Sequence, residues 1–384
     1  MGDLINRERL KALFLELVRI DAHSRREAAM AARLKQELES LGAGCEYDNA
    51  GEKVNGNTGN LIGRLDGNRP GAPPLLLCAH LDTVVPGEGV KPVVEGDIIR
   101  SDGTTVLGAD DKSGCAIICE VLRQLREHRL SHGPLDVVFT ICEEVGLLGA
   151  KHLDLARVRA REGLVFDSDL PGALYVRAPG AFSLLFAVKG LEAHAGMCPE
   201  RGISAIKVAA EAVAAMRLGR IDEETTANLG LIEGGRAVNV VPSQVTLHGE
   251  ARSRNEAKLT AQVEHMVSCF KEAVARHRMT LEGRTFNAEL DYSAEREYPA
   301  MDLSDDAPIV RRVIEAARRV QRKVVPAAMG GACDANIFNG RGLMVANLGT
   351  GMREVHTLRE CIDLNDMVAA AETTLELVKL YAAA

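Results

Sequence analysis

The chain has 384 residues, more than one hydrophobic core usually serves, so we expect two domains. A formal net charge of -8, an aromatic content of 3% and the absence of Trp argue against a nucleic-acid-binding surface. Since no apolar run approaches the roughly 20 residues that span a membrane, we expect no membrane insertion either.

The nine cysteines are odd in number, and none of them forms a CxxC pair. Several lie in apolar runs, for example Cys78, Cys115 and Cys142. This use of Cys as a small hydrophobic residue is typical of a reduced protein. The N-terminus also lacks the apolar core of a signal peptide, so the expected compartment is the cytoplasm.

The first half of the chain predicts an α/β domain. Helical spacing of apolar residues predicts two helices within 5–42. After a short strand over 60–65, three continuous apolar strands follow, over 74–79, 135–142 and 163–166, with an apolar helix from 116 to 125 after the first. Unbroken apolar strands are typical of sheets that are covered on both faces.

Each of these apolar strands runs directly into polar residues: His80 and Asp82, Glu143 and Glu144, and Asp167. Ligands of open α/β sheets collect at the carboxyl ends of strands. A set of His and carboxylate side chains matches the ligands of catalytic zinc or related divalent ions. The alternative for each motif taken alone is a solvated polar turn.

Two consecutive carboxylates, Asp110 and Asp111, follow the run that begins at Val106. Ionised neighbours of this kind repel each other, so a positive charge is expected nearby. Lys112 could supply it in a solvated loop, and a metal pair in a buried one. The alternative is an ordinary helix N-terminus whose dipole favours acidic residues.

At Pro179 the pattern changes to βαββαβ, which predicts a ferredoxin-like α+β domain. Its expected strands and helices are 181–188, 203–216, 227–232, 244–251, 255–275 and 285–296. The α/β pattern then resumes, with a helix over 307–320, a strand over 343–348 and a final helix over 365–381. We therefore expect one domain formed by 1–178 and 298–384, with 179–297 inserted into it.

Three further residues are candidates whose neighbours in the sequence leave the role open. His356 follows an apolar strand after a short Gly-rich loop, and His194 lies in the inserted domain. Arg252 ends a strand there and could bind a substrate carboxylate through two hydrogen bonds. Taken singly, a structural His356, a surface His194 and an Arg252 salt bridge explain them as well.

As an ordered set, these motifs resemble the dinuclear zinc exopeptidases of the peptidase T and carboxypeptidase G type, and most of all the peptidase T-like branch. The resemblance covers essentially the whole chain. It rests on six segments: His80-Leu-Asp-Thr-Val84, Gly103-Thr-Thr-Val-Leu-Gly-Ala-Asp-Asp-Lys-Ser-Gly114, Glu143-Glu-Val-Gly146, Asp167, Ala193-His-Ala-Gly196 and Gly351-Met-Arg-Glu-Val-His356. It implies a catalytic domain with a mixed, mostly parallel sheet and an inserted lid or dimerisation domain.

The resemblance also implies roles for the residues of the catalytic domain. It implies two divalent ions, zinc in the first place and Co or Mn as alternatives. One ion would be held by His80, Asp110 and Asp167, and the other by Asp110, Glu144 and His356. Glu143 would be the general base, and Asp82 would orient His80. The peptide bond between Asp110 and Asp111 would be cis.

For the inserted domain, the resemblance implies that His194 stabilises the oxyanion. His194 would act on the site of a partner subunit, or on its own site after a hinge motion. Asn239 and Arg252 would hold the substrate, and Asn336 is a further candidate for the substrate pocket. We expect a homodimer through the inserted domain, because a sheet edge or helix there suits a two-fold contact.

The function expected from these observations is metal-dependent hydrolysis of amide bonds in short peptides, by an aminopeptidase that could act on tripeptides. One alternative is a deacylase or carboxypeptidase acting on N-acyl amino acids. The other is a non-catalytic, metal-bound protein that binds peptides, although binding alone does not need a base such as Glu143.

Overall fold

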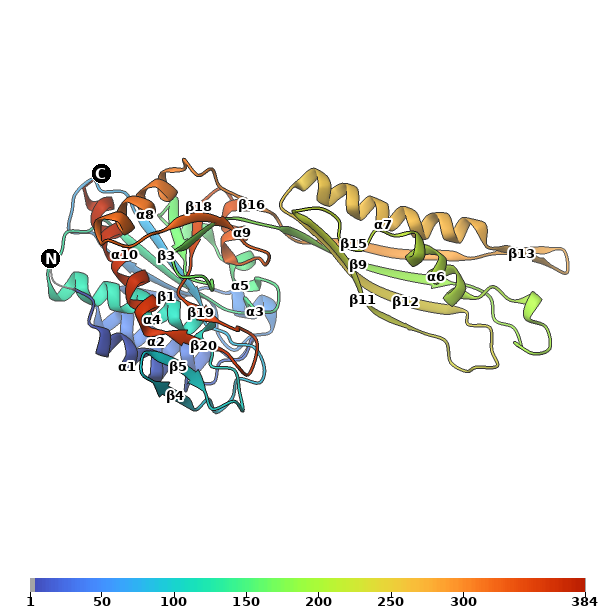
Figure 1. The fold of residues 1–384 in the computed structure, drawn as a ribbon, viewed down its shortest axis with the longest axis horizontal. Helices are drawn as coiled ribbons and strands as arrows, with labels where there is room; N and C mark the ends of the chain where they lie inside the picture. The colour runs from blue at the N-terminus through green and yellow to red at the C-terminus, as the bar shows by residue number, and fades with distance from the viewer. Residues whose placement is uncertain (1–3, 384) are drawn as a thin grey trace. The chain divides into compact units, whose positions relative to one another are not determined.

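A computed structural model describes residues 4–383, which divide into two compact units (Figure 1). The unit that was expected to be catalytic, called the catalytic unit below, comprises the chain up to Ala178 and from Met301 onward, and the inserted unit is Pro179–Ala300. The insertion was expected to end at 297. It ends later because its last long strand continues to Tyr298.

The catalytic unit is built on a nine-stranded mixed sheet in the order β1-β2-β6-β3-β7-β18-β8-β16, with β17 beside β8. Its centre is β6 (Leu135–Thr140), β3 (Leu75–His80), β7 (Glu162–Val165) and β18 (Met344–Leu348), which pair in parallel. All six residues of β3 and of β6 are buried. This confirms the predicted α/β fold with a parallel centre, because only a sheet covered on both faces buries whole strands.

Shorter strands flank this centre: β1 (Gly44–Tyr47), β2 (Leu61–Leu65), β8 (Ala173–Ala178), β16 (Met301–Asp302) and β17 (Val325–Ala328). The sequence did not predict a second, four-stranded sheet, which consists of β4 (Pro92–Glu95), β5 (Ile98–Ser101), β19 (Met352–Arg353) and β20 (Cys361–Asp363).

Helix α4 (Ala109–Glu127) packs on β3 and contacts three other long helices: α1 (Arg7–Leu17), α2 (Ala28–Ser40) and α10 (Leu364–Ala382). The helix α8 (Pro308–Arg319) packs on α10 and β18. Short helices complete the unit: α3 (Ala50–Val54), α5 (Leu148–His152) and α9 (Asp334–Gly340). In α4, Ile117, Ile118 and Val121 join the same core cluster as Leu75 and Leu77 of β3.

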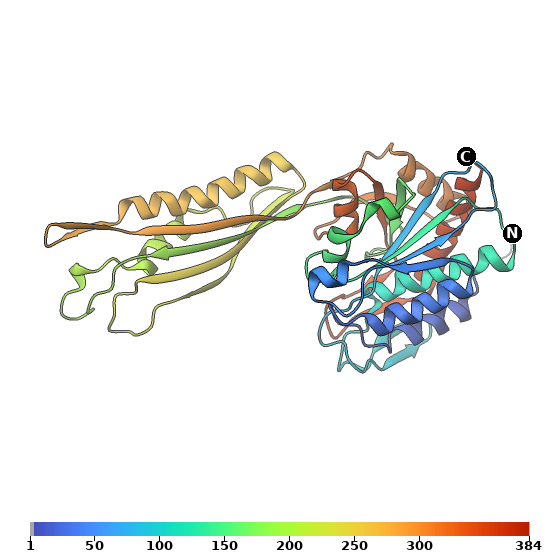
Figure 2. The same ribbon diagram turned by 180° about the vertical axis from the view of Figure 1, so that it is seen from behind.

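The inserted unit is an antiparallel sheet in the order β10-β11-β12-β9-β15 (Figure 2). Its strands are β9 (Gly180–Lys189), β10 (Gly219–Arg220), β11 (Thr225–Gly234), β12 (Gln244–Ser253) and β15 (Glu289–Tyr298). Helices α6 (Ala205–Ala215) and α7 (Glu256–Arg276) cover one face, where Leu184, Phe186 and Val188 of β9 are buried. The expected βαββαβ order is present.

One predicted strand of the inserted unit divides in two. The segment expected over 285–296 begins as β14 (Arg284–Asn287), which forms a hairpin with β13 (Arg278–Leu281), and continues as β15. The division falls at Ala288, whose N–H bonds to the His277 carbonyl instead of to a sheet partner. Within residues 4–383, no helix combines the length and apolarity needed to cross a membrane.

Candidate active site

Parallel strands bring the predicted ligands to one edge of the sheet. His80 is the last residue of β3, Glu143 and Glu144 follow β6, and Asp167 follows β7. Because these strands run in the same direction, their carboxyl ends meet at the same edge. Asp110 reaches this edge from the start of α4.

The carboxylate of Asp110 lies between two histidines. Its Oδ1 is 2.9 Å from Nε2 of His80, and its Oδ2 is 3.2 Å from Nε2 of His356. Nε2 of His356 is also 3.0 Å from a carboxylate oxygen of Glu144. Each oxygen of Asp110 therefore faces a different imidazole, which is the placement that a carboxylate shared by two metal ions requires.

Two groups of ligand atoms are close enough to hold an ion. The atoms of His80, Asp110 and Glu144 lie within 4.8 Å of one another, and so do those of His80, Glu143 and Asp167. These groups do not divide the side chains as the sequence resemblance implied, since His80 belongs to both. All the predicted ligands nevertheless lie in one cluster.

The cluster is rich in buried carboxylates. Burial raises the pKa of Glu143 and of Asp167 well above the ordinary values, and neighbouring carboxylates raise both further. Burial also acts to raise the pKa of Asp110, but hydrogen bonds from His356 and His80 outweigh it and hold that pKa low. The donors, two imidazoles among carboxylates that repel one another, fit divalent ions because such ions supply the missing positive charge.

Asp82 connects the two ligand-bearing strands. Its Oδ1 accepts a hydrogen bond of 2.9 Å from the Glu143 N–H, and its Oδ2 one of 3.2 Å from the Glu144 N–H. The Nδ1 atom of His80 is 3.0 Å from the Asp82 carbonyl oxygen and 3.5 Å from its Oδ1. Asp82 is thus placed to orient His80, mainly through its main chain, and it also anchors both glutamates.

The loop at Asp110 and Asp111 is buried, and the peptide bond between them is cis, as expected. Asp111 accepts hydrogen bonds from the N–H groups of His80 at 3.1 Å and Gly114 at 3.2 Å. The alternative of a solvated loop neutralised by Lys112 is wrong. The Lys112 ammonium is buried and donates to the Ile20 carbonyl at 2.8 Å, and burial lowers its pKa to about 8.

Three buried residues at this site were missed by the sequence analysis. Glu360 accepts from the N–H groups of Gly108 and Asp110, at 2.8 and 3.1 Å. Asn347 exchanges two hydrogen bonds with the Asp167 main chain. Asn347 could have been found, because it is the one amide in the apolar strand 343–348. Glu27, the third, has no comparable signal.

In the inserted unit, His194 and Asn239 lie side by side. The segments pair at His194 and Val240, and the Ala195 N–H donates to the Asn239 carbonyl at 2.9 Å. Both residues are exposed, and Nδ1 of His194 accepts hydrogen bonds from its own loop, at Gly196 and Met197.

Arg252 lies at the other end of the same sheet. It pairs with Ala181 at the start of β9, whereas the His194 loop follows the end of β9. The strand has 10 residues, and at about 3.3 Å per residue it separates the two ends by roughly 30 Å. The Arg252 guanidinium forms an ion pair with Glu250 at 2.8 Å.

Asn336 has no exposed surface, and it lies in the first turn of α9. Its Oδ1 accepts a hydrogen bond of 3.2 Å from the Cys333 N–H, which caps the helix. Burial and the helix cap account for Asn336 as a structural residue, and they give no support to a direct contact between Asn336 and substrate.

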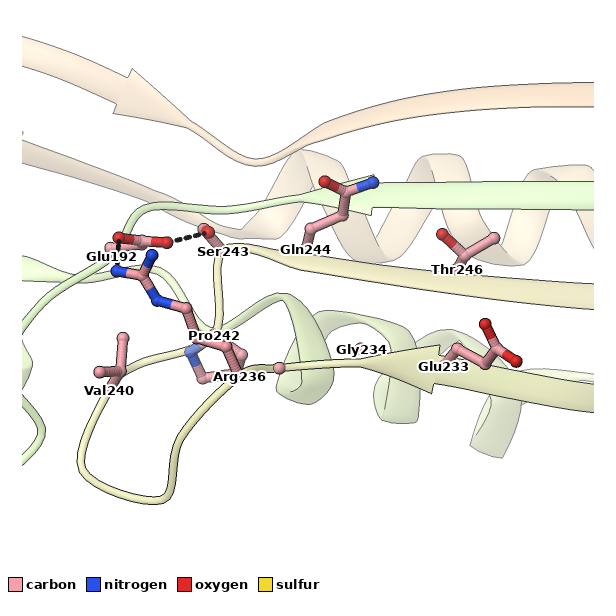
Figure 3. A pocket seen from close by; sticks show the side chains of 10 residues that line it. Glu192, Glu233, Gly234, Arg236, Val240, Pro242, Ser243, Gln244 and Thr246 are labelled. Atoms are coloured by element: carbon pink, nitrogen blue, oxygen red, sulfur yellow. Dashed lines mark hydrogen bonds and ion pairs between the residues drawn. The ribbon is translucent and has the colours of Figure 1, made fainter.

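A separate hollow of about 420 Å³ lies in the inserted unit, next to the segment of Asn239 (Figure 3). The guanidinium of Arg236 points to Glu192, with which it pairs at 2.7 Å, and Ser243 donates to the same carboxylate at 2.8 Å. Neither His194 nor Asn239 lines this hollow.

Comparison with known proteins identifies the class. The sequence pattern of Peptidase family M20/M25/M40 matches residues 76–380, and the chain belongs to this family. The chain is 39% identical to the uncharacterised protein YqjE of Bacillus subtilis (strain 168), over 98% of this chain and 99% of that one. The predicted family and fold are thereby confirmed.

Two solved structures are similar along their whole length. Aminopeptidase PepT from Bacillus cereus ATCC 10987 has a TM-score of 0.91 and 37% identity, covering 99% of this chain and 100% of that one. A tripeptidase from Staphylococcus aureus subsp. aureus mu50 has a TM-score of 0.93 and 35% identity, with the same coverage. A dinuclear metal-binding peptidase of Bacillus subtilis, at 18% identity and a TM-score of 0.74, shares the fold.

Proposed function

We propose that this protein is a metal-dependent aminopeptidase that hydrolyses short peptides, with two divalent ions, zinc or alternatively Co or Mn, at the carboxyl edge of the central sheet. The observation that carries the proposal is the position of Asp110, whose two carboxylate oxygens face His80 and His356. The similar aminopeptidase and tripeptidase support the same class of substrate.

When bound, the ions supply Lewis acidity and lower the pKa of coordinated water. His80, Asp110, Asp167, Glu144 and His356 are the residues that would hold them. Asp82 keeps His80 and the two glutamates in register through its hydrogen bonds to all three residues.

Glu143 is the proposed general base. It is buried, and burial and the neighbouring carboxylates raise the pKa of its carboxyl group well above the ordinary value, which makes it a stronger base than an exposed glutamate. It takes a proton from the attacking water onto its carboxylate and delivers this proton to the leaving amine. Catalysis by Glu143 distinguishes this proposal from a protein that only binds peptides, because binding does not need a base.

His194 is proposed to stabilise the oxyanion, and Asn239 and Arg252 to bind the substrate. A short peptide cannot contact both His194 and Arg252 of one inserted unit, since they lie at opposite ends of the sheet. This separation favours a homodimer in which His194 and Asn239 serve the site of the partner subunit. The inserted unit has exposed apolar residues, among them Ile206 of α6 and Leu231 of β11, that are available to a two-fold contact.

A cytoplasmic location is proposed as well. All nine cysteines are free, which suits a reducing compartment.

The test is a hydrolysis panel with the purified full chain and added Zn, Co or Mn. Tripeptides, dipeptides and N-acetylated peptides are compared with N-acyl amino acids. The proposal expects release of the N-terminal residue from free peptides and loss of cleavage on N-acetylation. Cleavage confined to N-acyl amino acids would establish a deacylase instead, and binding of metal without any hydrolysis would leave a non-catalytic protein.

A further inference from the structure

The glutamate pair sits on a main-chain turn whose N–H groups are held by buried carboxylates. Cys142, just before the pair, has φ 53, in the left-handed region that non-glycine residues rarely adopt. Asp82 binds the N–H groups of Glu143 and Glu144. The N–H of Cys142 goes to a different residue, Glu27, at 3.0 Å, and the Cys142 thiol donates to the same Oε1 at 3.3 Å.

Glu27 belongs to the segment just before α2, which is far from Cys142 in the sequence. The segment before α2 is fixed against the end of β3, because the Thr83 N–H donates to the Ala22 carbonyl at 2.9 Å and Ser24 donates to Asp82 at 2.6 Å. The Arg25 N–H donates to Glu27 Oε1 at 2.8 Å. One carboxylate oxygen therefore ties two segments together that are 115 residues apart.

The carboxyl group of Glu27 acts on the turn as a hydrogen-bond acceptor. Glu27 has no exposed surface, and the main influences on the pKa of its carboxyl group are burial and the Asp82 carboxylate, both of which raise it. Its Oε2 has no hydrogen-bond partner. A buried carboxyl group without a cation is costly, so its retention beside the glutamate pair indicates a use there.

We propose that Glu27 is a positioning residue that sets the orientation of Glu143 by holding the N–H of Cys142. This role rests on the proposed function, in which Glu143 is the base. Glu27 touches no reacting atom, and it acts through the turn. Removing the Glu27 carboxylate leaves the Cys142 N–H without its acceptor. The turn then no longer holds the main chain of Glu143, and with it the Glu143 side chain, in one orientation.

The test compares Glu27→Ala, Glu27→Gln and the matched control Glu120→Ala in the full chain. Glu120 is also buried and also accepts a main-chain hydrogen bond, from Asn6, but it belongs to α4 and pairs with Arg9 of α1. The first measurement is hydrogen–deuterium exchange of peptides that cover residues 141–145, without and with added zinc. The second is kcat and KM on the best substrate of the panel.

In Glu27→Ala we expect faster exchange over 141–145 and a kcat lowered by about 10–100-fold, the usual loss when support of a metal site is removed, with KM unchanged. Glu27→Gln keeps an acceptor and should restore both values. Glu120→Ala should lower thermal stability and change neither.

Exchange over 141–145 that stays at the wild-type rate in Glu27→Ala, or that rises equally in Glu120→Ala, overturns the positioning role. Faster exchange with an undiminished kcat overturns it too. A wild-type protein that hydrolyses nothing on the panel would refute the proposed function instead, and the exchange measurement separates the two failures because it does not depend on activity.

Discussion

Asp110 and Glu143 show how much one buried carboxylate depends on its neighbours. Both are buried, yet the two histidines hold the pKa of Asp110 low, whereas the pKa of Glu143 is high. Asp110 stays ionised between the two imidazoles, whereas the raised pKa of Glu143 makes its carboxylate the stronger base.

Glu143→Gln is expected to keep the fold and the metals and to lose most hydrolysis. Base catalysis is typically worth about 10²–10⁴-fold, and the amide cannot accept the proton from water. Turnover measured with metal analysis checks this. Glu144→Ala serves as the contrast, because it should lower the metal content after dialysis, and near wild-type turnover of Glu143→Gln would exclude Glu143 as the base.

Metal binding should release a proton from His356. Hydrogen bonds with Asp110 and Glu144 raise the pKa of His356 to about 10 in the metal-free protein, so its imidazole is charged at pH 7. An imidazole binds a metal ion only in its neutral form, and the affinity for zinc should therefore rise with pH. Titration calorimetry in buffers of different ionisation enthalpy counts the protons.

The His356→Ala variant is the control for this proton. It should bind zinc more weakly and release fewer protons than the wild-type protein. Equal proton release by both proteins would contradict the assignment of His356 as a ligand.

At the scale of elements, the parallel centre of the sheet explains why the residues that follow three of its strands converge, and two further segments join them. β3, β6 and β7 deliver His80, the glutamate pair and Asp167 to one edge, and the kinked start of α4 places Asp110 among them. The loop after β19 adds His356. The position of these residues thus follows from the direction of the strands, because parallel strands place the polar residues at their carboxyl ends along the same edge of the sheet.

A crystal soaked with zinc should show two ions roughly 3.5–4 Å apart, as in two-metal hydrolytic sites, with Asp110 between them. The geometry supports this because the two oxygens of Asp110 face different imidazoles. Anomalous scattering at the zinc edge locates the ions. A single ion at full zinc occupancy, or a pair that Asp110 does not touch, would refute the arrangement.

At the scale of the whole molecule, the proposed role of His194 depends on whether it acts on the metal site of its own subunit or on that of a partner subunit. His194 and Arg252 lie at opposite ends of one sheet, so a dimer with exchanged His194 loops is the expected arrangement. Ile206 of α6 and Leu231 and Ile232 of β11 are exposed apolar residues of the inserted unit that such a dimer could bury.

Mixing inactive His194→Ala with inactive Glu143→Ala subunits should restore activity if His194 works across the dimer, because the hybrid carries one intact site. Light scattering at the assay concentration establishes the oligomeric state, and refolded mixtures supply the hybrids. Each variant refolded alone is the control. Confirmed hybrids without recovery would exclude the trans role, and a monomer would exclude the dimer.

The sequence by itself determined the fold class and the family, and it predicted the candidate ligands that the structure brings into one cluster. Local patterns were sufficient for this, because an apolar strand followed by His80, Glu143 or Asp167 defines both the buried element and the polar residue at its end. The inserted domain was predicted from the order of the elements, which changes at Pro179 to βαββαβ.

Only the tertiary structure decided how those residues are held. Glu27, Glu360 and Asn347 bind main-chain groups that are 115, 250 and 180 residues away, and no local pattern contains such contacts. The burial of Asn336 and the distance between His194 and Arg252 likewise follow from packing and strand register. The chemical type of each side chain can be read from the sequence, whereas its hydrogen-bond partners depend on which distant segments the fold brings beside it.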